Sequence, residues 1–162
     1  MNTEKFNLFI VDEDPQLLKG LRRYLVNKFG SRMAISTFIS GASALEKVDY
    51  NTKIVVLKYA VNDGGNDVLR SIKKINPDTA VIMLSSHEEI GMAIESFRDG
   101  ATDFVIQGKN AWNRIAGDVY RIMDIPVRVL VKHFGVTKYV AAFILSFIAM
   151  GIVVFVTLNI IR

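Results

Sequence analysis

Residues 6–30, FNLFIVDEDPQLLKGLRRYLVNKFG, combine a short apolar run with a longer amphipathic stretch. The run Phe6–Val11 is bounded by polar residues, which predicts a buried strand. Asp14 and Pro15 predict a helix N-cap and the first helical residue, and apolar residues then recur at helical spacing up to Gly30, which predicts the helix end. The segment is therefore expected to form a strand followed by a helix.

The same alternation recurs four more times along the chain. Further strands are predicted at 33–38, 54–57, 80–84 and 103–106, and helices at 42–48, 67–75, 87–98 and 110–123. In the last helix, the residues predicted to face inward are Trp112, Ile115, Ala116, Val119, Ile122 and Met123. Apolar strands alternating with amphipathic helices predict an α/β fold with a parallel sheet covered on both faces, where function gathers at the carboxyl ends of the strands.

The C-terminal end has a different character. Residues 139–161, YVAAFILSFIAMGIVVFVTLNII, contain no charged residue and no proline. As a helix this stretch would extend about 34 Å, enough to cross the hydrocarbon core of a bilayer. We therefore predict a domain at 1–124, a juxtamembrane linker at 125–137 and a single transmembrane helix at 138–162, which spans the membrane from Tyr139 to Ile161 as a tail anchor.

Flanking charge predicts the orientation of this span. The basic residues that precede it are Arg121, Arg128, Lys132 and Lys138, whereas Arg162 alone follows it. Because cytoplasmic flanks are enriched in Lys and Arg, we expect an inner-membrane protein with its N-terminal domain in the cytoplasm. For the linker two interpretations stay open: an amphipathic helix on the membrane surface, or a continuation of the preceding helix.

The charge of the chain supports a membrane rather than a nucleic acid as its neighbour. Residues 1–108 are nearly balanced in charge, but residues 109–162 carry seven Lys and Arg against two acidic residues. A basic segment beside an apolar one favours an anionic membrane surface. The chain contains no cysteine, which excludes disulfides and thiolate sites.

Four motifs give residues 6–108 a resemblance to the receiver domain of two-component response regulators. They are FIVDEDP at 9–15, IVVLK at 54–58, PDTAVIMLSSHEE at 77–89 and GATDFVIQG at 100–108. The resemblance implies a flavodoxin-like, doubly wound five-stranded parallel sheet between five helices. It also implies an acidic pocket that binds Mg²⁺, beside an aspartate that follows the third strand and accepts a phosphoryl group.

Carried over position by position, the resemblance gives a degenerate pocket. Asp12 and Glu13 fall on the acidic pair, Ser85 on the hydroxyl position and Phe104 on the aromatic switch position. The phosphoacceptor position, however, holds Lys58, and Gln107 stands where the family has a lysine.

These departures exclude aspartate-type phosphorylation at position 58. A protonated lysine has no lone pair with which to attack phosphorus, and it adds positive charge where Mg²⁺ would need a carboxylate. We expect no metal ion, with Asp12 and Glu13 vestigial, and we expect Lys58 to point toward them and neutralise them. The alternative is that Lys58 extends into solvent. Ser85 is expected to bond to nearby backbone. A replacement acceptor at Asp63 is the weaker alternative.

The sequence thus favours a non-enzymatic, cofactor-free adaptor on the membrane that binds protein partners, membrane proteins among them. The face formed by the fourth helix, fifth strand and fifth helix is the expected binding surface. No nucleic acid or small-molecule substrate is expected, while a homo-oligomer is possible through the small residues Ala142, Ser146 and Ala149. The alternatives are a structural subunit held mainly by its transmembrane helix and an atypical phosphorylation-dependent regulator.

Overall fold

The computed structural model describes residues 6–60, 64–87 and 90–133, with side chains described up to Met123. The chain divides into two units, Met1–Met123 and Asp124–Arg162. In the first, five parallel strands lie in the order β2-β1-β3-β4-β5. In chain order they are β1 (Phe6–Val11), β2 (Met33–Phe38), β3 (Thr52–Lys58), β4 (Ala80–Ser85) and β5 (Asp103–Ile106).

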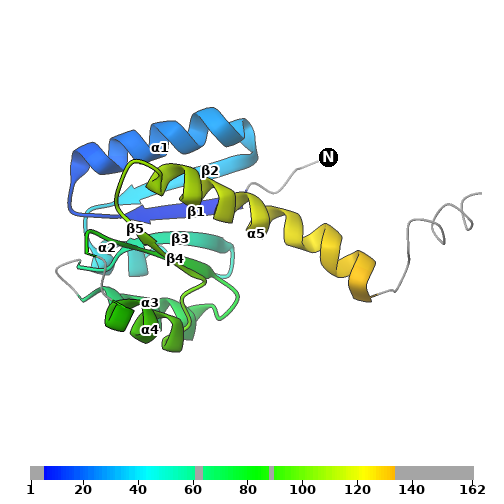
Figure 1. Ribbon diagram of the computed structural model, residues 1–162. Coiled ribbons are helices and arrows are strands. Elements are labelled where there is room, and N and C mark those ends of the chain that lie inside the picture. The colour runs from blue at the N-terminus through cyan, green and yellow to red at the C-terminus, as the bar shows by residue number, and fades with distance from the viewer. Residues whose placement is uncertain (1–5, 61–63, 88–89, 134–162) are drawn as a thin grey trace, which may run out of the picture. The chain divides into compact units, whose positions relative to one another are not determined.

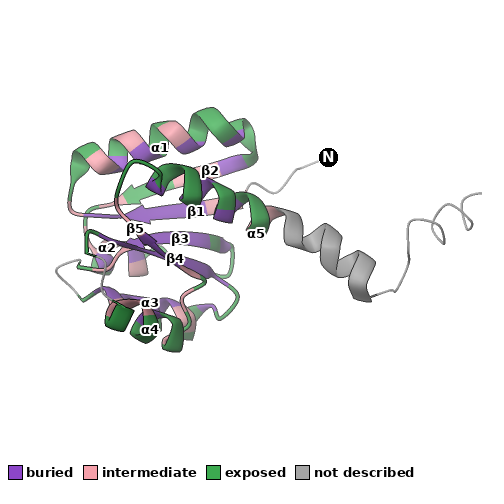
Figure 2. Cartoon of the chain, viewed as in Figure 1, coloured by how far each residue is buried: buried purple, intermediate pink, exposed green. Residues whose placement is uncertain are grey.

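Helices cover both faces of this sheet (Figure 1). They are α1 (Pro15–Phe29), α2 (Gly41–Leu45), α3 (Gly65–Ile75), α4 (Ile90–Arg98) and α5 (Ala111–His133), with a short 3₁₀ turn η1 (Gly30–Arg32) after α1. One apolar cluster joins α1 and α5 to one face, and a second joins α2, α3 and α4 to the other. Figure 2 shows the buried residues concentrated on the strands. The predicted doubly wound parallel fold is confirmed.

Local signals explain where α1 begins and ends. The Asp14 side chain accepts a hydrogen bond from the Gln16 backbone N–H at 2.8 Å, and Pro15 follows as the first helical residue. Gly30 closes the helix with a φ of 62°, in the left-handed region that favours glycine. Between them, the buried side chains recur on one face and pack on the sheet: Leu18, Leu21, Leu25 and Phe29.

One prediction about α5 is wrong, and the backbone follows one of the two alternatives for the residues after Met123. Trp112, expected inside, is 37% exposed and lies against α1, where its ring meets the Tyr24 ring at a centroid distance of 5.7 Å. The helix does not end at Met123. Its backbone continues through Pro126 to His133. No glycine interrupts residues 124–133, which have apolar and basic residues at helical spacing. For these residues, the backbone follows the continuation alternative.

The predicted transmembrane segment is a separate matter. Among the described residues, none of the helices combines the length and hydrophobicity needed to cross a bilayer. The predicted span Tyr139–Ile161 lies outside the described residues, as do Lys138 and Asp63.

Candidate functional site

The strand register brings the ends of β1 and β3 together. Val11 is the last residue of β1, and its register partner is Leu57 of β3. The next residues along the two strands are Asp12 and Lys58. Since parallel strands present their carboxyl ends at one edge of the sheet, these two side chains emerge side by side, where ligands bind in doubly wound folds.

Lys58 and Asp12 form an ion pair at this edge. Lys58 Nζ lies 3.0 Å from Asp12 Oδ1, and the Asp12 side chain is 1% exposed against 21% for Lys58. The same Oδ1 accepts a hydrogen bond from the Asp14 backbone N–H at 2.8 Å. Asp12 Oδ2 is buried and has no hydrogen-bond partner among the described residues. A buried carboxylate without a counter-charge would be costly, so Lys58 supplies the neutralisation that Asp12 needs.

The residues at this edge do not fit the Mg²⁺ that the resemblance implies. A divalent cation beside Asp12 would face the ammonium group of Lys58, which already holds Oδ1. Within the described residues, no three acidic or histidine side chains converge as a metal site would require. Mg²⁺ needs several oxygen ligands at short range, and here a cation replaces one of them. Glu13 is half-buried next to the pair.

Ser85 and Gln107 belong to the same edge but serve backbone contacts. The Ser85 hydroxyl donates to the His87 carbonyl at 3.0 Å and accepts from the His87 N–H at 3.1 Å. The Gln107 backbone N–H donates to the Ser85 carbonyl at 2.7 Å. The hydroxyl therefore bonds to the backbone of its own loop, as the sequence predicted.

Phe104 is linked to α4 through Tyr59, the residue after Lys58. The buried Phe104 ring meets the Tyr59 ring edge-on at a centroid distance of 6.1 Å, and the Tyr59 hydroxyl donates to Glu95 Oε2 of α4 at 3.3 Å. A contact chain thus runs from the end of β3 to both β5 and α4. It gives the Lys58 edge a physical connection to the surface of α4.

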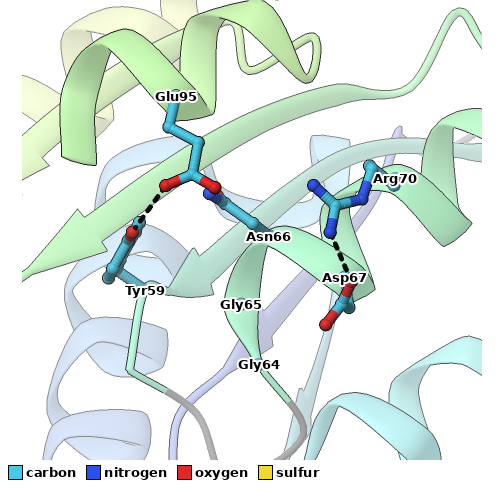
Figure 3. A pocket seen from close by; sticks show the side chains of 7 residues that line it. All are labelled: Tyr59, Gly64, Gly65, Asn66, Asp67, Arg70 and Glu95. Carbon is cyan, nitrogen blue, oxygen red and sulfur yellow. Dashed lines mark hydrogen bonds and ion pairs between the residues drawn. The ribbon is translucent and has the colours of Figure 1, made fainter. Parts of the chain in front are cut away.

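A small pocket of about 210 Å³ opens beside Tyr59 (Figure 3). None of the site residues predicted from the sequence line it; its walls are Tyr59, Gly64, Gly65, Asn66, Asp67, Arg70 and Glu95. Arg70 is held by ion pairs with Asp67 and Asp99, and Glu95 accepts the Tyr59 hydroxyl. Each charged side chain of this pocket therefore already has a partner.

A pair of carboxyl groups between β5 and α5 was missed by the sequence analysis. Burial, followed by the hydrogen bond and charge of Asp103, raises the pKa of Asp118 to about 6. Burial also acts to raise the pKa of Asp103, but the hydrogen bonds from Asp118 and Arg114 outweigh it and leave that pKa lowered. The helical spacing of Asp118 from inward-facing Ile115 was the signal that could have identified it.

The predicted juxtamembrane residues are only partly described. Arg121 is 72% exposed and forms an ion pair with Asp118. Arg128 and Lys132 lie in the helical backbone of α5, and their side chains fall outside the described part.

Comparison with known proteins agrees with the fold. The family model of the response regulator receiver domain matches residues 8–110. The transcriptional regulatory protein ZraR of Klebsiella oxytoca is 30% identical over 110 residues, which cover 66% of this chain and 24% of ZraR. The two-component response regulator PprB of Pseudomonas aeruginosa is 31% identical over 103 residues, 61% of this chain and 37% of PprB. The chain thus spans much less than half the length of these relatives.

Solved structures give the same result. The BeF3-activated DrrB receiver domain superposes with a TM-score of 0.65 at 26% identity, over 74% of this chain and 98% of that one. A signal receiver domain of a putative LuxO repressor protein from Vibrio parahaemolyticus superposes with a TM-score of 0.65 at 21% identity, over 78% of this chain and 97% of that one. Because the family model matches more than half of the chain's length, this chain belongs to the response regulator receiver domains.

Proposed function

We propose that this receiver domain works without phosphorylation, as a membrane-anchored module that binds other proteins. The observation that carries the proposal is the ion pair between Lys58 and Asp12. An ammonium group at the acceptor position offers phosphorus no nucleophile, and it neutralises the carboxylate that a metal ion would otherwise need. The Lys58 side chain thus takes the place of a metal ion beside Asp12.

The proposed anchor is the apolar segment Tyr139–Ile161, with the basic residues before it keeping the domain in the cytoplasm. Anchoring confines the domain to a thin layer at the membrane and raises its effective concentration toward membrane partners. This supports binding partners that are themselves membrane proteins.

Treatment of the full chain with acetyl phosphate and Mg²⁺ tests the central point. Intact-mass spectrometry should show no gain of a phosphoryl group, under conditions that modify a receiver domain with an aspartate acceptor. A stable modification of the wild-type chain would overturn the proposal and favour the atypical regulator, with Asp63 as the first residue to map.

Deletion of residues 137–162 separates the adaptor from a subunit held mainly by its transmembrane helix. A partner recovered with the full chain in mild detergent should still bind the truncated domain if the domain carries the contacts. Loss of that partner on truncation would favour the helix-held subunit instead. Carbonate washing of membranes checks the anchor itself, because an integral protein stays in the pellet.

A further inference from the structure

Helix α1 and the turn that follows it carry an uncompensated positive charge. From Pro15 to Leu45 the sequence contains five Lys and Arg and no Asp or Glu, whereas residues 46–123 contain ten basic residues against eleven acidic ones. All five basic side chains are exposed. We call them the α1 cation patch: Lys19, Arg22, Arg23, Lys28 and Arg32.

Within the described residues, none of these five cations forms an ion pair. Two of them are held in place by neutral groups instead. Arg22 Nε donates to the Ile35 carbonyl and Arg32 Nε to the Phe29 carbonyl, each at 3.3 Å. The two ion-paired arginines of α5 differ in this respect, because aspartates neutralise them. The patch therefore presents its full charge to the surroundings.

Three cations of the patch lie together on the flank of α1 that borders the edge strand β2. Arg22 marks this flank because it reaches a β2 carbonyl, whereas Tyr24 packs against α5 on the other flank. Val26 is 38% exposed and follows Arg23, Arg22 and Lys19 by three, four and seven residues. These spacings place Val26 among the three cations.

Exposed cations without counter-charges are complementary to an anionic surface. Guanidinium and ammonium groups donate to lipid phosphates, and each Lys or Arg near an anionic bilayer strengthens binding about fivefold. Helix α1 offers no free aromatic ring for the base stacking on which single-stranded nucleic-acid sites rely, because Phe29 is buried and Tyr24 packs on Trp112. The patch therefore favours lipid headgroups over single-stranded nucleic acid.

The course of the chain supports a bilayer as the occupant. Helix α1 lies on the same face of the sheet as α5, the helix from which the chain continues toward the predicted anchor. Fifteen residues separate Met123, where the first unit ends, from the predicted span that begins at Tyr139. They reach about 22 Å as a helix and at most about 50 Å extended. A patch confined so close to a bilayer meets its lipids at high effective concentration, so weak contacts are sufficient.

We infer that the α1 cation patch docks the receiver domain onto the anionic lipids around its anchor. The inference rests on the membrane anchor of the proposed function. Helices α1 and α5 cover one face of the sheet, and α2, α3 and α4 cover the other. Docking through α1 therefore orients the domain and leaves the layer of α2, α3 and α4 open to protein partners.

Fluorescence quenching in nanodiscs tests the docking, because the native chain contains no cysteine and can be labelled at one chosen position. Val26→Cys places a fluorophore among the cations of the patch. Ile75→Cys, at the end of α3 in the other helix layer, is the matched control, because the two positions are 38% and 37% exposed. The labelled full-length variants are placed in nanodiscs of phosphatidylcholine with or without phosphatidylglycerol, with spin-labelled lipid as the quencher.

We expect quenching at position 26 and little at position 75, only when phosphatidylglycerol is present, and weaker quenching as the salt concentration rises. A triple variant of the patch should weaken the docking equilibrium about a hundredfold and restore emission at position 26: Lys19→Gln, Arg23→Gln and Lys28→Gln. It leaves in place the two arginines that hold backbone carbonyls. A control triple variant removes the same charge at exposed positions outside the patch and should leave the quenching unchanged: Lys74→Gln, Arg98→Gln and Lys109→Gln.

The other outcomes separate the anchor from the docking. Failure of the full chain to co-elute with nanodiscs would overturn the anchor, and the docking with it. Co-elution with equal quenching at both positions, or with quenching that does not depend on anionic lipid, would overturn the docking alone. Protection of position 26 from an aqueous quencher, without quenching by lipid, would show a protein on the patch, such as a second copy or an acidic partner, and would also overturn the docking.

Discussion

Lys58 Nζ and Asp12 Oδ1 lie 3.0 Å apart at the carboxyl ends of neighbouring strands, with Asp12 almost completely buried. The lysine therefore provides the positive charge that a buried carboxylate requires. It does so from the position at which other members of this family are expected to carry the acceptor aspartate. Under the proposed function, a lysine at this position leaves phosphorus without a nucleophile and supplies the counter-charge of Asp12.

Replacing Lys58 by methionine should destabilise the domain. The aliphatic stem is retained, but the buried Asp12 carboxylate loses its counter-charge. We expect the free energy of unfolding to fall by about 1–3 kcal/mol, with a lower melting temperature for the domain. Urea denaturation followed by circular dichroism measures the change.

A double-mutant cycle separates the ion pair from other effects of this substitution. Asp12→Asn removes the charge that Lys58 neutralises, so Lys58→Met should cost less in that background. Equal costs in both backgrounds would mean that the pair makes no net contribution and that Lys58 acts through its stem alone.

Much of the fold and of the central site could be predicted from the sequence. The β1 and β5 bounds follow from short apolar runs between polar residues, and Asp14, Pro15 and Gly30 delimit α1 by capping chemistry. The approach of Lys58 to Asp12 follows from topology, because both residues directly follow central apolar runs of a parallel sheet. Ser85 bonding to local backbone was likewise predictable once no phosphoryl group was expected.

Tertiary packing decided the features that the sequence analysis missed. Helical periodicity placed Trp112 inside, but the ring packs on α1 at Gly20, where even a Cβ would lie 2.8 Å from it. The sequence left open whether the preceding helix continues into residues 125–137, and the backbone does continue to His133. The exposure of the apolar residues of α4 could not be predicted from the sequence, because apolar residues at helical spacing are usually expected to face the core.

Replacing Asp118 by asparagine should change how stability depends on pH. The pKa of Asp118 is raised from 3.8 to about 6 in the folded state. The folded protein therefore binds this proton more tightly than the unfolded chain, and the contribution of Asp118 becomes less favourable as pH rises from about 4 to about 6. The lowered pKa of Asp103 has the opposite effect: its contribution to stability becomes more favourable as pH rises.

Asparagine cannot ionise, so the variant should gain stability relative to wild type across that pH window, by on the order of 1 kcal/mol. Chemical denaturation at pH 4, 5, 6 and 7 measures the difference. Glu46→Gln, at an exposed position, is the control for simple loss of an acid. A difference between Asp118→Asn and wild type that is constant with pH would contradict the raised pKa of Asp118.

Two glycine-to-alanine substitutions should have opposite effects. A Cβ on Gly65 would lie 2.8 Å from the Lys58 carbonyl oxygen and closer still to that of Tyr59, both rigid backbone atoms. Gly65→Ala should therefore destabilise the domain by about 1–3 kcal/mol. Gly117 lies inside α5, and a Cβ at this position would meet open space, so Gly117→Ala should stabilise by about 0.5–1 kcal/mol. Thermal unfolding compares the two, and a neutral Gly65→Ala would show that β3 and α3 are not packed this closely.

Lys58→Asp should restore the capacity to accept a phosphoryl group. The substitution removes the ammonium from Asp12 Oδ1 and places a third carboxylate beside Asp12 and Glu13, which suits Mg²⁺ and provides a nucleophile. Adding Gln107→Lys should strengthen the effect by contributing a cation for the phosphoryl oxygens. Intact-mass spectrometry after incubation with acetyl phosphate and Mg²⁺ measures the modification.

Lys58→Asn is the matched control, because it removes the ammonium without creating a nucleophile. Modification of Lys58→Asp but not of Lys58→Asn or wild type would show that the missing carboxylate nucleophile at position 58 separates this chain from a phosphorylated receiver. An inert Lys58→Asp, Gln107→Lys double variant that is still folded would show a different cause: the Ser85 hydroxyl, bonded to His87, and the loop after β5 hold the edge in a geometry that no longer admits a phosphoryl group.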